Sequence, residues 1–115
     1  MNRIDEILTE LGIGPNLLGF GYIKRALEIG MEDEHAICRI TTIYKTIGME
    51  KQFPAYCIER GIRSAIKVCW NRCKEDTLFK YFPKAIYTKS KSPKNAEFIG
   101  FLLMSLRTEE PKDEK

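Results

Sequence analysis

The sequence has no long apolar run and almost no histidine. The single histidine among 115 residues is His35. No segment approaches the roughly 20 consecutive apolar residues that cross a bilayer, and residues 1–20 lack the basic and then apolar order of a secretory signal. From these absences we expect a cytoplasmic protein with no membrane partner.

The chain also lacks the motifs on which common enzymes and metal sites depend. There is no glycine-rich phosphate loop and no paired-carboxylate motif, and His35 has no nucleophile near it in the pattern. The four cysteines, Cys38, Cys57, Cys69 and Cys73, include no CxxC pair and lie apart from His35. We therefore predict no catalytic residue, no cofactor and no metal, and we expect the thiols to be reduced and buried.

Charge is distributed unevenly along the chain. Residues 1–50 carry 5 basic and 8 acidic side chains, a net charge of −3, whereas residues 51–107 carry 12 basic and 4 acidic ones, a net charge of +8. A basic excess confined to one half favours a face that binds a polyanion, with nucleic acid the first candidate and an acidic membrane surface the second. An ordinary solvated surface is the alternative.

Apolar residues recur at helical spacing through most of the chain. Because 43% of the residues are apolar, we expect one helical domain over residues 1–107, followed by a flexible charged tail over 108–115. Gly19 and Gly21 fall inside one expected helix, where close packing would explain them. The spacing predicts helices over about 2–11, 17–30, 36–44, 44–51, 54–72 and 78–82, and a last one ending near 106 that Ser92 with Pro93, or Asn95, would cap.

Residues 44–72 have the pattern of a helix-turn-helix, in which the second helix enters the major groove of DNA. A short helix containing the small Gly48 ends near Lys51, and a long helix begins at Pro54 or Ala55. One face of the long helix is an apolar stripe. The opposite face is mostly basic and comprises Tyr56, Glu59, Arg60, Arg63 and Lys67. An amphipathic helix with a solvated basic face is the alternative interpretation.

These side chains suit contacts with base edges. The planar fork of arginine can donate two hydrogen bonds to guanine, and a carboxylate can accept one from cytosine. Tyr56, Glu59, Arg60 and Arg63 are therefore the candidate base-contacting residues, although Glu59 could instead form an i,i+4 ion pair with Arg63, worth a few tenths of a kcal/mol. Both arrangements could hold together.

Lysines supply the candidate phosphate contacts. Residues 88–95 form a polar loop with three lysines and no acid, and the loop leads into the last predicted helix, whose N-terminus favours an anion. The predicted phosphate-binding residues are Lys67, Lys89, Lys91 and Lys94. A solvated connector with no ligand is the alternative for this loop.

Two segments resemble the C-terminal DNA-binding effector domain of the stage zero sporulation protein A family, the master response regulators that start endospore formation. They are residues 58–70, with the pattern ER-x-IR-x-AI-x-V-x-W, and residues 91–99, KSPKNAEFI. Residues 7–13 and 19–23 resemble the opening of the same domain. The resemblance covers roughly residues 4–107.

The resemblance implies an all-α domain of about six helices with a helix-turn-helix, in the winged-helix-like superfamily of response-regulator effector domains. It implies that the recognition helix, about 54–72, contacts a short G/C-containing box through Glu59, Arg60 and Arg63. Lys89, Lys91 and Lys94 would lie near the DNA backbone. The implied partners are double-stranded DNA, a second copy of the chain on tandem sites, and an RNA polymerase sigma factor.

The chain departs from the family pattern in three places. Cys57 stands where the family has a base-contacting arginine, and Tyr56 replaces a small hydroxyl residue. The lysine loop is one residue longer than in the family. In addition, 115 residues leave no room for the family's receiver domain beside this one. The favoured function is a DNA-binding transcriptional regulator; the alternative is an interaction module that does not bind DNA and antagonises the full-length regulator or RNA polymerase.

Overall fold

The computed structural model describes residues 2–109, which form six α-helices and one short 3-10 helix. Within this range there is no strand, only an isolated bridge between Thr88 and Lys91. The predicted all-α class with about six helices is confirmed. The elements are α1 (Arg3–Glu10), α2 (Leu18–Glu32), η1 (Ala36–Arg39), α3 (Ile40–Lys51), α4 (Ala55–Arg72), α5 (Glu75–Tyr81) and α6 (Asn95–Glu109).

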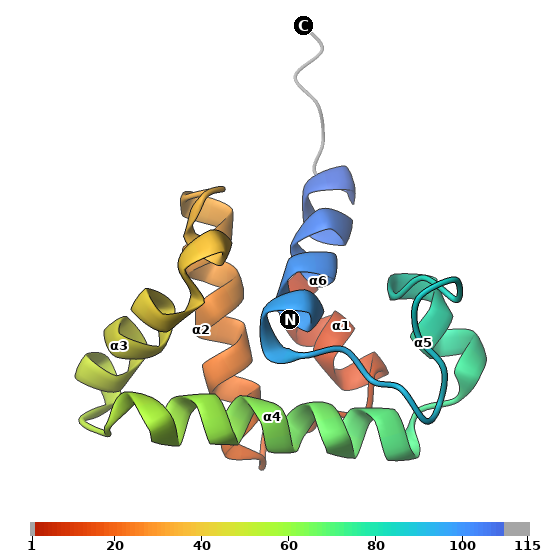
Figure 1. The fold of residues 1–115 in the computed structure, drawn as a ribbon, viewed down its shortest axis with the longest axis horizontal. Helices are drawn as coiled ribbons and strands as arrows, with labels where there is room; N and C mark the ends of the chain where they lie inside the picture. Colours follow the sequence, from red (N-terminus) through yellow and green to blue (C-terminus); the bar gives the residue numbers. More distant parts are fainter. Residues whose placement is uncertain (1, 110–115) are drawn as a thin grey trace, which may run out of the picture.

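Helix α4 is the element against which three of the other helices pack. It runs along the bottom of Figure 1, and α2, α3 and α6 pack against it on one side. Its predicted apolar stripe faces these helices, because every member is at most 2% exposed: Ile58, Ile62, Ala65, Ile66 and Cys69. Burial of this stripe leaves the opposite face of α4 to solvent.

The structure divides the two helices predicted over 36–44 and 44–51 at a different place: residues 36–39 form η1, and residues 40–51 form the single helix α3. After η1 the chain turns at Arg39 and continues as α3 without a break at Tyr44. No helix breaker interrupts this segment, and Ile43, Tyr44 and Ile47 all lie on the buried face of α3. The boundary predicted at Tyr44 is therefore wrong.

The last helix extends beyond its predicted end. Thr108 and Glu109 belong to α6, so these two residues are not part of a flexible tail. The carboxylate of Glu109 accepts hydrogen bonds from Arg3 Nε at 2.6 Å and from Arg3 Nη2 at 2.9 Å, which joins the end of α6 to α1. The rest of the predicted tail, residues 110–115, lies outside the described residues.

Helices α2 and α4 approach each other closely at Gly19. A Cβ on Gly19 would lie 2.5 Å from the carbonyl oxygen of Gly61 and 2.5 Å from Ala65 Cβ. A Cβ on Gly21, in contrast, would meet nothing within 4 Å. Close packing therefore explains Gly19, as expected, but it does not explain Gly21.

Candidate nucleic-acid interface

A tight turn joins α3 to α4. Gln52 ends α3 in the left-handed conformation, with φ 65°, and Phe53 N–H donates to Gly48 O at 2.9 Å. A Cβ on Gly48 would lie 2.6 Å from the carbonyl oxygen of Phe53, so only glycine fits there without a shift of the backbone. Pro54 precedes the first residue of α4 and has no N–H that the helix would leave unpaired. The predicted helix-turn-helix geometry is thus present.

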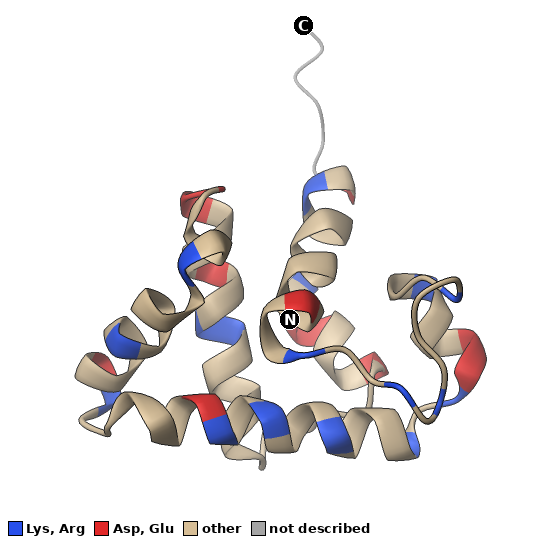
Figure 2. Cartoon of the chain, viewed as in Figure 1, with Lys and Arg blue, Asp and Glu red and all other residues tan. Residues whose placement is uncertain are grey.

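The basic face of α4 is open to solvent. Figure 2 shows the charged residues along the length of this helix. The Tyr56 residue is 61% exposed, the side chain of Arg63 is 53% exposed and that of Glu59 is 33% exposed; Arg60 is exposed as well. All four side chains are therefore at least partly accessible to a ligand that approaches this face of α4.

Glu59 and Arg63 form the ion pair that their spacing allows. Arg63 Nη2 donates to Glu59 Oε1 at 3.0 Å. Because both groups are partly exposed, the pair contributes only a few tenths of a kcal/mol, and its main effect is to orient the two side chains. Over residues 2–109 Arg60 forms no ion pair, so its guanidinium donors are available to a ligand.

A groove lies between α4 and the segment that enters α6. It has a volume of about 510 Å³ and is open to solvent. Four candidate residues line it together: Glu59, Arg63, Lys67 and Lys94. The structure thus brings base-contacting and phosphate-binding candidates from two distant parts of the sequence to one surface. Lys91 is exposed on the loop that leads to this groove.

Lys89 has a different set of partners. Its ammonium donates to Trp70 O at 2.5 Å and to Cys73 O at 2.9 Å. The last carbonyls of a helix have no intrahelical donor, and a lysine near them completes their hydrogen bonding. The structure therefore places the Lys89 ammonium on the C-terminal end of α4, although the residue is exposed like Lys91 and Lys94.

The N-terminus of α6 already holds an anion from its own chain. Glu97 Oε1 accepts from the Lys94 backbone N–H at 3.1 Å and from Tyr87 OH at 2.9 Å. Both bonds lower the pKa of Glu97, and the bond from Lys94 has the larger effect. Neither the Ser92 nor the Asn95 side chain accepts a hydrogen bond from the first turn of α6, so neither caps the helix as predicted.

Sequence reasoning missed the structural role of Asn95. Its side chain is turned into the protein and the residue is 8% exposed. Asn95 Nδ2 donates to Tyr44 OH at 3.1 Å and to Glu59 O at 3.0 Å. A cap was the only role that the local pattern indicated, since these partners lie 51 and 36 residues away along the chain.

The cysteines differ in burial. Cys69 and Cys73 are buried and Cys57 is half-buried, but Cys38 is exposed, so the expectation of buried thiols is wrong at that residue. Burial raises the pKa of the Cys69 thiol to about 12. That thiol is therefore neutral at physiological pH and a poor nucleophile.

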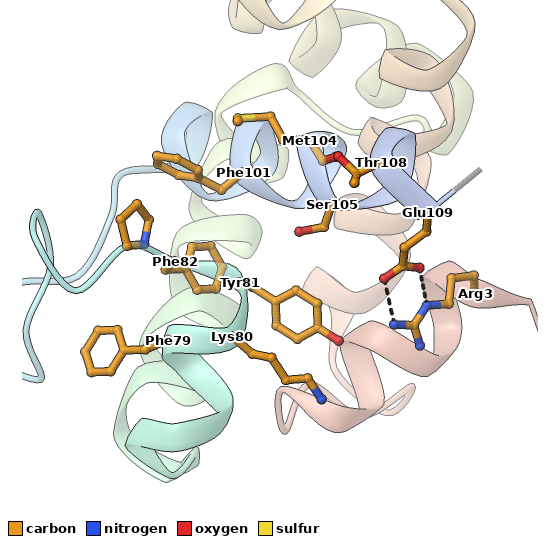
Figure 3. Close-up of a pocket in the computed structure, with 11 residues that line it drawn as sticks. Arg3, Phe79, Lys80, Tyr81, Phe82, Phe101, Met104, Ser105, Thr108 and Glu109 are labelled. Carbon is orange, nitrogen blue, oxygen red and sulfur yellow. Dashed lines mark hydrogen bonds and ion pairs between the residues drawn. The ribbon is translucent and has the colours of Figure 1, made fainter. Parts of the chain in front are cut away.

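A second hollow, of about 500 Å³, lies between α5 and α6 and includes no residue of α4 (Figure 3). Its wall includes the aromatic rings of Phe79, Tyr81, Phe82 and Phe101. At one end the Arg3 guanidinium is paired with Glu109. The hollow is thus mainly apolar and contains no cluster of unpaired basic groups.

Neither a metal cluster nor a membrane-spanning segment is found over residues 2–109. No three histidine, cysteine, aspartate or glutamate side chains of this range gather closely enough to hold a metal ion. None of its helices combines the length and apolarity that crossing a bilayer requires.

Six helices, a tight turn after α3 and an exposed basic α4 define a helix-turn-helix domain. The family model described as "Sporulation initiation factor Spo0A C terminal" matches residues 4–106. The chain therefore belongs to this family of sporulation-related DNA-binding regulatory domains, which is not a family of enzymes. The family assignment made from residues 58–70 and 91–99 is confirmed.

Proposed function

We propose that this chain is a sequence-specific DNA-binding transcriptional regulator whose helix α4 enters the major groove. One observation carries the proposal: the open basic face of α4 and the loop that bears Lys91 and Lys94 lie beside the same groove. DNA binding uses two kinds of contact, since phosphate contacts position a protein on the duplex and base contacts specify the sequence. This surface offers side chains for both.

The candidate residues divide between the two tasks. Arg60, which forms no ion pair over residues 2–109, contacts guanine in the proposed complex, while the Glu59–Arg63 pair presents an acceptor and a donor one helical turn apart. Tyr56 completes the base-contacting set. Lys67, Lys91 and Lys94 contact phosphates, and Lys89 is left out because its ammonium is bonded to the end of α4.

The preferred DNA box should differ from that of the family. Cys57, half-buried on the first turn of α4, replaces an arginine that contacts bases in the family. A thiol is a weak donor and cannot form the two parallel hydrogen bonds that arginine donates to guanine. Specificity then depends more heavily on Arg60 and on the Glu59–Arg63 pair.

The test begins with selection of bound sequences from a randomised duplex library, followed by affinity measurements on the selected box. Arg60→Ala should lose about 1–3 kcal/mol of binding free energy and relax the preference at one base pair. Lys91→Ala should weaken all sequences equally and reduce the salt slope by about 0.9, the value for one phosphate contact. If both variants bound like the parent chain, the assignment of this face would be wrong.

The second candidate is an interaction module that no longer binds DNA, and the replacement of the family arginine by Cys57 favours it. Such a protein would antagonise the full-length regulator or RNA polymerase by occupying their partners. It would show no retention on promoter DNA at low salt, whereas a DNA-binding regulator is retained there and released as salt rises. The partners proposed for the regulator are double-stranded DNA, a second copy on tandem sites and an RNA polymerase sigma factor, all in the cytoplasm.

A further inference from the structure

We propose that Asn95 is a positioning residue that fixes the lysine loop, residues 88–94, against the recognition helix α4. Through this anchor Lys91 and Lys94 would reach phosphates while α4 occupies the groove. The inference rests on the proposed function, because it names the residue that joins the two parts of the DNA-binding surface. Asn95 itself touches neither bases nor phosphates in this proposal.

The contacts of Asn95 join three helices at one point. The residue is the first of α6, directly after Lys94, and its two amide hydrogens have two acceptors, Tyr44 OH on α3 and Glu59 O on α4. Glu59 also carries one of the base-contacting side chains. The position of the loop end is therefore set relative to the backbone of the residue that faces the DNA.

The other end of the loop is held by α4 as well. Trp70 Nε1 donates to Thr88 O at 2.7 Å, and Lys89 Nζ bonds to the last carbonyls of the helix. Between the two anchors the exposed Lys91 and Lys94 project from a segment whose ends cannot move independently of α4. A surface that is ordered before binding loses less conformational entropy when the duplex arrives.

A polar residue at this buried position points to orientation as its role. An apolar side chain of similar size would fill the space without requiring hydrogen-bond partners, whereas an amide is tolerated there only because both of its donors are paired. Hydrogen bonds to Tyr44 OH and Glu59 O specify one arrangement of the three helices, which apolar packing specifies less sharply.

The experiment compares Asn95→Leu with Tyr44→Phe, a matched control that removes the phenol acceptor and keeps the bond to Glu59 O. Affinity for a short duplex of mixed sequence is measured between about 50 and 200 mM salt. Tyr44→Phe should keep the parent's salt slope. Asn95→Leu should show a shallower slope, by up to about 1.8, the value for two lost phosphate contacts. In a Lys91→Ala/Lys94→Ala background, Asn95→Leu should cause no further change in slope.

Stability and loop order are measured on the same variants. In Asn95→Leu the buried Tyr44 phenol is left without a hydrogen-bond partner. If that variant is unstable for this reason, the Asn95→Leu/Tyr44→Phe double variant, which removes the phenol, is measured in its stead. Hydrogen exchange at the Lys91 and Lys94 amides, which donate to Thr88 O and to Glu97, should become faster in the variant. A folded variant with the parent's salt slope and unchanged exchange at these amides would overturn the inference.

The outcomes separate the inference from the proposed function. If the parent chain bound duplex DNA with a clear salt slope and Asn95→Leu kept that slope, the role of Asn95 in DNA binding would be wrong and the proposed function would stand. If the parent chain showed no salt-dependent binding, the proposed function would be wrong, and the hydrogen-exchange comparison would still decide whether Asn95 fixes the loop on α4.

Discussion

Replacing Gly19 with alanine should destabilise the fold, whereas the same change at Gly21 should stabilise it. Both glycines lie in α2, so both substitutions gain about 0.5–1 kcal/mol of helix propensity. A methyl group on Gly21 meets nothing within 4 Å, and the propensity gain remains. On Gly19 it would lie 2.5 Å from the backbone oxygen of Gly61 and from Ala65 Cβ, atoms that cannot rotate away.

The clash at Gly19 can be given a magnitude. Overpacking a well-packed interior costs about 1–3 kcal/mol, and subtracting the propensity gain of about 0.5–1 kcal/mol leaves a net loss of up to about 2.5 kcal/mol. Thermal or urea unfolding followed by circular dichroism measures both variants. For a domain of this size 1 kcal/mol corresponds to a change in Tm of roughly 4 °C. Equal stabilisation by the two substitutions would refute the close approach of α2 to α4 at Gly19.

Three further predictions concern single side chains. Lys89→Met should lower the free energy of unfolding by about 1–2 kcal/mol, because two carbonyls at the end of α4 lose a charged donor, while Lys91→Met should leave it within about 0.5 kcal/mol in the same unfolding assay. Ile62→Asp should prevent folding at neutral pH, visible as loss of helical circular dichroism, because it buries an unpaired charge at a position that is 0% exposed. The Lys80 ammonium lowers the pKa of Glu10. The stability that this carboxylate contributes is therefore present above its usual pKa and is lost as the pH falls through the lowered pKa. The free energies of unfolding of Glu10→Gln and of the parent should thus differ at neutral pH and converge in acid.

The helices of this domain follow from the sequence because helical periodicity is a local property. The stripe from Ile58 to Cys69 predicted both the buried face of α4 and, by opposition, its exposed basic face. The position of Gly48 before the turn likewise predicted the close approach that the structure shows. The helix boundary predicted at Tyr44 was wrong because the spacing of apolar residues does not show where one helix ends and the next begins.

The candidate interface was predicted only in part. Arg60 and Arg63 lie on a helix face whose exposure follows from the apolar stripe opposite, so sequence reasoning could assign them. Sequence reasoning could name the lysines of the loop, but it could not tell which of them bonds within the protein and which is available to a ligand. That depends on which carbonyl groups come near each flexible ammonium once the chain has folded. The same reasoning could not distinguish Gly19 from Gly21, since a neighbour on another helix decides which glycine is required.

The sequence by itself determined the helical class, the helix-turn-helix, the basic face of α4 and the family. Only the tertiary structure decided that Lys89 completes the end of α4 and that Asn95 joins α6 to α4. The physical reason is the range of the interactions involved. Helix formation depends on residues three or four positions apart, whereas the contacts of Lys89 and Asn95 join residues 16 to 51 positions apart and exist only after the helices have packed.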